Sequence, residues 1–194
     1  MRLSLSPSIT APMRITRRRL GDFLNARSGL AALEFALILP AMLVVYVGGV
    51  ELNDAISIRR KVSHATSTFA DLGAQASATV TATDLSDYFK AASAILSPYD
   101  TSLLKATVVG VAIDANGKAT VAWSQAYNGA TCPAKGSSVT VPANLVTANG
   151  FLVMADASYA FTPKLGYVLT GTFNMTDKVI AQPRLGRALT GPTC

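Results

Sequence analysis

An uncharged apolar segment constrains this chain more than any other feature. Residues 35–50 read FALILPAMLVVYVGGV, and residues 30–33 extend the segment across Glu34 to 21 residues. At about 1.5 Å per residue, a helix of that length covers roughly 30 Å, the thickness of a bilayer core. The sequence therefore predicts a transmembrane helix over 30–50.

The formal charge lies almost wholly ahead of this segment. The chain carries +6, and residues 1–29 hold six basic residues against one acidic residue, so this basic leader is +5 and the remainder is +1. The positive-inside bias predicts a cytoplasmic N-terminus and export of residue 51 onward. Because the nearly neutral remainder offers no basic face for phosphates, we expect no nucleic-acid partner.

Two features of the N-terminal region leave alternatives open. Met13 opens a more conventional basic leader than Met1, so either methionine is a candidate start. A secretory signal peptide has the same order of parts, with cleavage near Gly48 and Gly49. Against it, the apolar run exceeds the usual length of about 7 to 15 residues and leads directly into helix-compatible sequence.

Glu34 is an unusual residue for a membrane segment. A carboxylate there costs several kcal/mol unless it is interfacial, paired or neutral. Gly29 lies five residues earlier in the string RSGLAALEF. Cleavage after Gly29 would make Leu30 the new N-terminus and Glu34 the fifth mature residue, which is the arrangement of a type IV prepilin leader.

Residues 28–75 resemble the TadE-like family of pseudopilins from tight-adherence (Flp) pilus systems. A weaker resemblance covers residues 158–163 and 181–184, and the middle of the chain shares only composition. The features that carry the main resemblance are Gly29, the pair Glu34–Phe35, Pro40, the exit residues Gly48 and Glu51, and the basic helix that follows.

The resemblance implies a non-catalytic pseudopilin or minor pilin that acts in pilus assembly or initiation. It would be cut after Gly29 by a prepilin peptidase and held in the bacterial inner membrane, with its C-terminal domain in the periplasm. Its implied partners are the inner-membrane assembly platform with its ATPase, a sister pseudopilin and the Flp-type major pilin. The competing hypothesis is an uncleaved single-pass envelope protein with a periplasmic binding or structural domain.

Two roles remain open for Glu34. In pilins the glutamate commonly pairs with the N-terminal amine of a neighbouring subunit, which would make Glu34 and Phe35 assembly contacts. An unpaired glutamate one helical turn inside the span could instead snorkel to water. We favour the assembly role, because an ionisable residue inside a membrane segment is costly and usually marks a functional site.

The helical pattern continues after Glu51, and residues 51–78 are expected to form a helical spine. Packing of its apolar stripe on the chain's own exported domain is favoured over a coiled coil, because the stripe is short and partly alanine. The stripe consists of Ile58, Val62, Ala65, Phe69, Leu72 and Ala76.

Polar residues on this spine are expected to face solvent. For the basic triplet 59–61, a solvated face is favoured over a contact with lipid phosphates or an acidic partner. His64 has no acid or cysteine at ligand spacing, so a solvated histidine is favoured over a metal ligand.

Residues 79–194 are predicted to form the exported head domain. Thr83 is expected to cap a second helix that carries Asp84 and Asp87 in its first turn, and Ser97–Pro98 to end it. A hairpin follows, since alternating apolar residues flank the turn sequence Asn116–Gly117.

Two further strands are expected over 151–161 and 173–181, joined by a loop with an apolar tip at 163–171. A small helix or turn is expected at 144–149. The predicted fold class is thus α+β: a long pilin-like N-terminal helix packed on a small antiparallel sheet with one further helix.

Both cysteines lie in the part predicted to be exported. A disulfide between Cys132 and Cys194 follows in an oxidising compartment, and two free thiols are the alternative.

The sequence contains no convincing catalytic, cofactor-binding or metal-ligating group of residues. Its single histidine is on the predicted spine, its eleven acids are scattered, and no phosphate-binding glycine motif is present. Residues 114–117 resemble the start of a calcium loop, but the later acidic ligands are missing, so a hairpin turn is favoured. We therefore expect no enzyme activity, no cofactor and no metal.

Overall fold

The computed structural model describes residues 27–194, so most of the predicted basic leader and the choice between Met1 and Met13 lie outside the described part. The chain divides into two compact units, Met1–Val47 and Gly48–Cys194. The helix α2, Arg27–Ala74, begins in the first unit and ends in the second.

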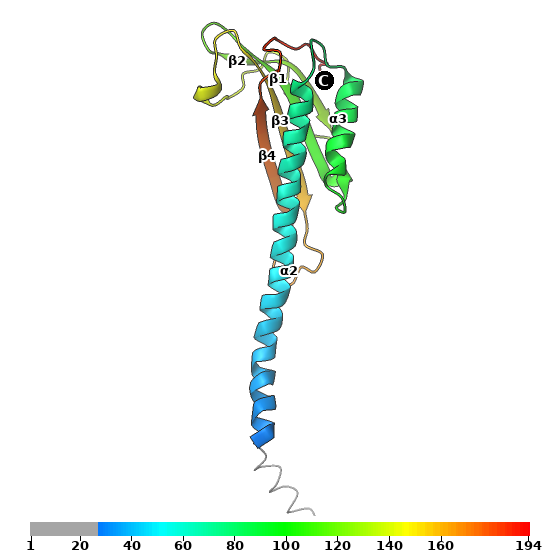
Figure 1. The fold of residues 1–194 in the computed structure, drawn as a ribbon, viewed down its shortest axis with the longest axis vertical. Coiled ribbons are helices and arrows are strands. Elements are labelled where there is room, and N and C mark those ends of the chain that lie inside the picture. The colour runs from blue at the N-terminus through cyan, green and yellow to red at the C-terminus, as the bar shows by residue number, and fades with distance from the viewer. Residues whose placement is uncertain (1–26) are drawn as a thin grey trace, which may run out of the picture. The chain divides into compact units, whose positions relative to one another are not determined.

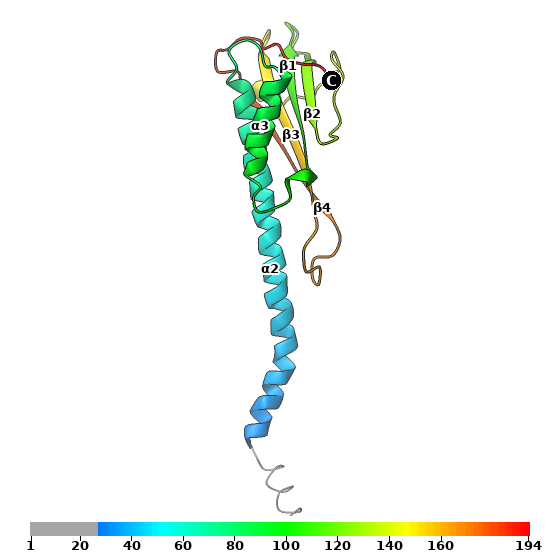
Figure 2. The same ribbon diagram turned by 90° about the vertical axis from the view of Figure 1, so that its right-hand side faces the viewer.

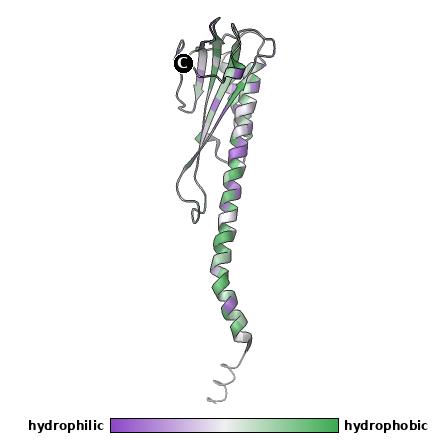
Figure 3. Ribbon diagram, turned by 90° about the vertical axis from the view of Figure 1, so that its left-hand side faces the viewer, coloured by the Kyte–Doolittle hydropathy of each residue, from purple (hydrophilic) through white to green (hydrophobic). Residues whose placement is uncertain are grey.

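In the first unit, α2 is apolar on every side. All side chains from Gly29 to Tyr46 are exposed, and Figure 3 shows the N-terminal half of α2 coloured mainly as hydrophobic. Pro40 lies within the helix, as is tolerated in membrane helices. A helix that is hydrophobic all round belongs in a core or a bilayer, and α2 is long and apolar enough to span a membrane.

The second unit is α+β, which confirms the predicted fold class. Its four antiparallel strands are β1 Leu104–Ile113, β2 Ala119–Tyr127, β3 Phe151–Phe161 and β4 Phe173–Ala181, in the order β2-β1-β3-β4. The second helix is α3, Ala82–Ala94. It lies beside the C-terminal half of α2, and both helices cover one face of the sheet (Figures 1 and 2).

The predicted cap of α3 was two residues too late. Thr81, not Thr83, is the N-cap, and its side chain accepts a hydrogen bond from the Asp84 backbone N–H while Asp84 accepts one from the Thr81 backbone N–H. This reciprocal capping box needs an acid at the third helical position, which fits Thr81 and not Thr83.

The expected hairpin and the expected short helix or turn are both present. β1 and β2 extend beyond the alternating residues, because β1 is a central strand buried on both faces and therefore tolerates small residues without alternation. The small helix or turn expected at 144–149 is a short 3-10 helix, Ala143–Leu145, followed by a turn in which Asn149 has a positive φ of 59°.

The main core lies between the helices and the sheet. Phe69 of α2 packs edge-on against Phe89 and Tyr127, whose rings stack on each other with centroids 4.7 Å apart. A smaller core covers the opposite face of the sheet around Val109, Val111 and Leu152. Both faces of the sheet are therefore covered at least in part.

Trp123 occupies a slot formed by two glycines. A Cβ atom at Gly110 would overlap the indole ring, and one at Gly191 would lie 2.5 Å from it. The indole Nε1 donates a hydrogen bond to the Leu189 carbonyl at 2.9 Å. The C-terminal segment is thus held against β2 by the only tryptophan in the chain.

Candidate functional site

The predicted cleavage site lies at the exposed start of α2. Apart from its chain neighbours and the adjacent backbone of α2, no atom of the described residues comes within 4 Å of the place where a Cβ on Gly29 would stand, and Leu30 is 59% exposed. The bond between them lies in the first turns of the helix, where intrahelical hydrogen bonding is incomplete. Nothing in the described chain covers this bond.

Glu34 and Phe35 are both exposed on the same helix. Among the described residues, Glu34 has neither a hydrogen-bond partner nor an ion-pair partner. Any partner of Glu34 would therefore come from outside the described residues.

The carboxylate of Glu51, in the second unit, is buried and accepts several backbone hydrogen bonds. It is only 2% exposed, and it accepts backbone hydrogen bonds from three consecutive residues far along the chain. Its Oε1 accepts from Tyr167 N–H at 2.8 Å, and its Oε2 accepts from Val168 N–H at 3.0 Å and Leu169 N–H at 2.6 Å. We call this arrangement the Glu51 clasp.

The clasp favours the ionised form of Glu51. Hydrogen bonds from the backbone, led by that of Leu169, lower the pKa of Glu51 below its ordinary value, and they outweigh the opposing effect of desolvation. The clasp is therefore a charge-assisted set of hydrogen bonds, which are stronger than neutral ones.

The clasp holds a loop that joins β3 to β4, residues 162–172. The hydroxyls of Thr162 and Thr172 are 2.9 Å apart and close the base of this loop. Near its tip, Val168 packs on Gly48, since a Cβ there would stand 3.3 Å from Val168 Cγ1. The 162–172 loop thus contacts α2 at the end of the predicted membrane segment, from Gly48 to Glu51, and both views show it extending beyond the sheet (Figures 1 and 2).

The three residues of the basic triplet, 59–61, have different environments. Arg59 and Arg60 are exposed, as expected for a solvated face. Lys61 is different, because its Nζ donates to the carbonyls of Ile95 at 3.1 Å and Ser97 at 2.7 Å. It thereby binds free carbonyls at the C-terminal end of α3, where a positive charge is favourable.

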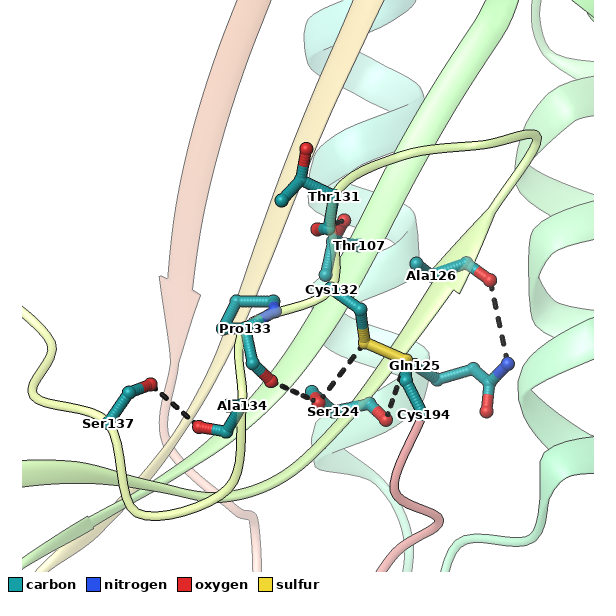
Figure 4. Close-up of a disulfide and its surroundings, with 10 residues drawn as sticks. All are labelled: Thr107, Ser124, Gln125, Ala126, Thr131, Cys132, Pro133, Ala134, Ser137 and Cys194. Carbon is teal, nitrogen blue, oxygen red and sulfur yellow. Dashed lines mark hydrogen bonds between the residues drawn. A yellow bond between two sulfur atoms is a disulfide. The ribbon is translucent and has the colours of Figure 1, made fainter.

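The two cysteines are joined as a disulfide between Cys132 and Cys194 (Figure 4). The neighbouring Ser124 is fully buried and donates from Oγ to the Pro133 carbonyl at 2.7 Å. Its own backbone N–H donates to the Pro192 carbonyl at 3.1 Å. Ser124 on β2 therefore fastens both segments that the disulfide connects.

A shallow groove of about 570 Å³ lies on the sheet face beside this disulfide loop. Its charged residues are Lys105, Asp156 and Lys178, of which Asp156 and Lys178 form an exposed ion pair at 3.1 Å. Within residues 27–194, no group of three or more acids, histidines or cysteines is placed to hold a metal. His64 is exposed on α2, and residues 114–117 form the expected hairpin turn.

A comparison with known families decides what the exposed helix is similar to. Residues 29–71 match the family described as TadE-like protein. This TadE-like segment covers less than a quarter of the chain, and it confirms the resemblance seen around Gly29, Glu34 and Glu51.

Two further comparisons found no relative. No curated protein and no solved structure matches the chain. The TadE-like segment ends at residue 71, before α3 and the sheet, so the match says nothing about the remainder of the head domain.

Sequence reasoning identified the residues of the TadE-like segment and missed the clasp. It noted Glu51 as part of the exit pattern and 163–171 as an apolar-tipped loop, but it did not connect them. A signal was available: Glu51 is the first acid after the apolar run, at a place where a lone carboxylate needs hydrogen bonds. Its partners, 116 to 118 residues away, could not be found from spacing.

Proposed function

We propose that this protein is a non-catalytic pseudopilin or minor pilin that acts in the assembly or initiation of a tight-adherence pilus. The observation that carries the proposal is the match of residues 29–71 to the TadE-like family, on a helix whose residues from Gly29 to Tyr46 are all exposed. In this proposal α2 crosses the bacterial inner membrane with its N-terminus in the cytoplasm and the sheet in the periplasm.

Processing after Gly29 is supported by exposure and by sequence. The bond to Leu30 is open to a membrane peptidase, and the glycine has no side chain to obstruct an active site. The arginines before it would be retained on the cytoplasmic side by the positive-inside bias, which keeps the bond on the side where prepilin peptidases act.

Glu34 would then carry the assembly contact together with Phe35. The carboxylate has no partner in the described chain, and cleavage would create a protonated amine on Leu30 of each subunit. Pairing of this amine with Glu34 of a neighbour would neutralise two charges in an apolar setting, where each alone is costly. The partners implied are a prepilin peptidase, the assembly platform with its ATPase, a sister pseudopilin and the major pilin.

N-terminal sequencing of the protein extracted from membranes tests the processing. A start at Leu30 is the expected result. A start at Met1 or Met13 would support the uncleaved anchor instead, and a start near Glu51 would indicate a secreted domain.

Substitution of Glu34 tests the assembly role. We expect Glu34→Ala to insert into the membrane at normal levels and to abolish piliation, because the neighbour's amine loses its counter-charge. Glu34→Asp is the matched control, since it keeps the charge on a shorter stem and should retain part of the piliation. Normal pili in Glu34→Ala would refute the assembly role and leave the cleavage result unaffected.

The second candidate function is that of an uncleaved envelope protein with a binding domain. The groove beside the disulfide loop is the observation in its favour, but its charged pair is exposed to solvent. Because exposed ion pairs contribute little energy, this groove supports binding less well than the TadE-like segment supports assembly.

A further inference from the structure

The tip of the 162–172 loop exposes large apolar side chains to solvent. Tyr167 is 79% exposed, Leu165 is 51% exposed and Val168 is 44% exposed, all within four residues. Single exposed apolar residues are common on protein surfaces, but a cluster on a projecting loop usually marks a contact surface.

The position of the loop indicates its partner. Val168 packs on Gly48, and the backbone of Tyr167 binds Glu51, so the exposed side chains lie where the uncharged segment 30–50 ends. A bilayer that surrounds this segment has its interface at that point of the chain. Tyrosine is a preferred residue at such interfaces, and Tyr46 places a second exposed tyrosine near the end of the same segment.

The Glu51 clasp equips the loop for this environment. A loop that enters the interface must not bring unpaired backbone N–H groups into a medium poor in water. Three consecutive N–H groups of the tip, those of residues 167–169, are already bound by Glu51. The clasp turns the polar backbone inward and leaves the apolar side chains outward.

The neighbouring charge also suits a phospholipid surface. Lys164 is exposed at the start of the tip and forms no ion pair with any described residue. A lysine beside apolar anchors can place its stem along the apolar region and its ammonium among lipid phosphates.

We propose that the tip of the 162–172 loop, with Leu165, Tyr167 and Val168, inserts into the headgroup region of the leaflet from which α2 emerges. The loop is then a second, shallow membrane contact that sets the depth and orientation of the Gly48–Cys194 unit at the lipid surface. This inference rests on the membrane placement of α2 in the proposed function, and it is independent of leader cleavage and of pilus assembly.

Depth-dependent fluorescence quenching tests the proposal on the full chain. Since both native cysteines are joined as a disulfide, a single new cysteine can carry an environment-sensitive fluorophore. The test variant is Tyr167→Cys, Met42→Cys reports the middle of the apolar segment, and Ala115→Cys reports the distant β1–β2 turn. Each variant is reconstituted in phosphatidylcholine–phosphatidylglycerol vesicles with a lipid quencher near the headgroup or near the acyl-chain end.

The expected result is a graded pattern. The probe at position 167 should emit at shorter wavelength than the probe at 115 and be quenched mainly by the headgroup quencher. The probe at 42 should be quenched mainly by the deep quencher, and the probe at 115 by neither.

Three outcomes would overturn the inference. If the probe at 42 is quenched while those at 167 and 115 behave alike, the loop does not reach lipid although α2 spans the membrane. If the probe at 167 shifts without lipid quenching and the shift disappears as protein is diluted with lipid, another copy of the chain covers the loop. If the probe at 42 is not quenched, the membrane placement of α2 fails, and this inference fails with it.

Discussion

At the scale of single residues, Glu51 shows how one carboxylate can define a local structure. It satisfies three backbone donors of the 162–172 loop, and it is buried while doing so. Buried carboxylates are retained when hydrogen bonds replace their hydration. The 162–172 loop should therefore depend on the ionisation of this one group.

The clasp should weaken in acid. Because the folded-state pKa of Glu51 is lowered, its contribution to stability is fully present above the ordinary glutamate pKa and is lost as the pH falls through the lowered value. We expect hydrogen-exchange protection of residues 167–169 to decrease over that acidic range. Glu51→Gln should show weaker protection at neutral pH and little further change in acid.

Asp54→Asn is the matched control for Glu51→Gln. It removes a carboxylate one helical turn away that binds no described residue, so protection of the loop should be unchanged. Full protection of the loop in Glu51→Gln at neutral pH would contradict the importance of the charge.

The Trp123 slot gives a second prediction for a single residue. Gly110→Ala should destabilise the fold by about 1 to 3 kcal/mol, because the added methyl overlaps the indole and strains its hydrogen bond to Leu189. Chemical denaturation followed by tryptophan fluorescence measures this effect, since Trp123 is the only tryptophan. Gly49→Ala is the control, because it adds its methyl in open space. Equal stability of the two variants would show that the slot adapts.

At the scale of elements, α2 and α3 are coupled through Lys61. Its ammonium binds two carbonyls at the end of α3 that would otherwise lack partners from the helix itself. Lys61→Met keeps most of the apolar stem and removes the charge, and we expect it to lower the free energy of unfolding by about 1 kcal/mol. Denaturation of the detergent-solubilised protein measures the change.

Arg60→Met tests whether a loss of unfolding free energy in Lys61→Met comes from the lost hydrogen bonds to the end of α3 or only from the lost positive charge. Arg60 is exposed and binds no described residue, so its replacement should leave stability nearly unchanged. An equal loss in both variants would argue that net charge, and not the bond to α3, is responsible.

The elements also show which parts of the fold could be predicted from the sequence. β3 and β4 have the predicted bounds, 151–161 and 173–181, because alternation and turn residues are local signals. The α3 cap was misplaced because several threonines compete there, and only the reciprocal bond with Asp84 selects Thr81. The remaining features left no periodic signal in the sequence. The hydrogen bonds of the clasp, of Lys61 and of the Trp123 indole all join residues at least 34 positions apart. The fit of Trp123 between two glycines depends in addition on close packing.

At the scale of the whole molecule, the C-terminal segment is integrated with the Gly48–Cys194 unit. Thr190 exchanges backbone hydrogen bonds with the connector ahead of α3, at 2.8 Å to Val80 and 2.9 Å to Ala78. The Cys132–Cys194 bond then closes a separation of 62 residues. The segment is thus held at several points along its length.

Removal of the disulfide should lower stability without unfolding the sheet. For the joint variant Cys132→Ser with Cys194→Ser, the loop-entropy model gives a loss of about 4 kcal/mol. We expect hydrogen exchange near Cys194 to rise, while the amide of Val80 stays protected by Thr190. Denaturation and exchange of the full chain test both points, and an unchanged free energy of unfolding would show that the unfolded chain is not restrained by this bond.

The Glu51 clasp also has a mechanical consequence. The pair Gly48–Gly49 would be an easily deformed part of α2 when the helix is pulled. A pulling force along α2 reaches the clasp at Glu51, two residues after Gly49. Three adjacent hydrogen bonds share that load and pass it into the joined ends of β3 and β4, in parallel with the route along α2. The part of α2 from Gly48 onward is therefore joined to the sheet at two separate places, through the Glu51 clasp and through the core around Phe69, and a force on this part of the helix is shared between them.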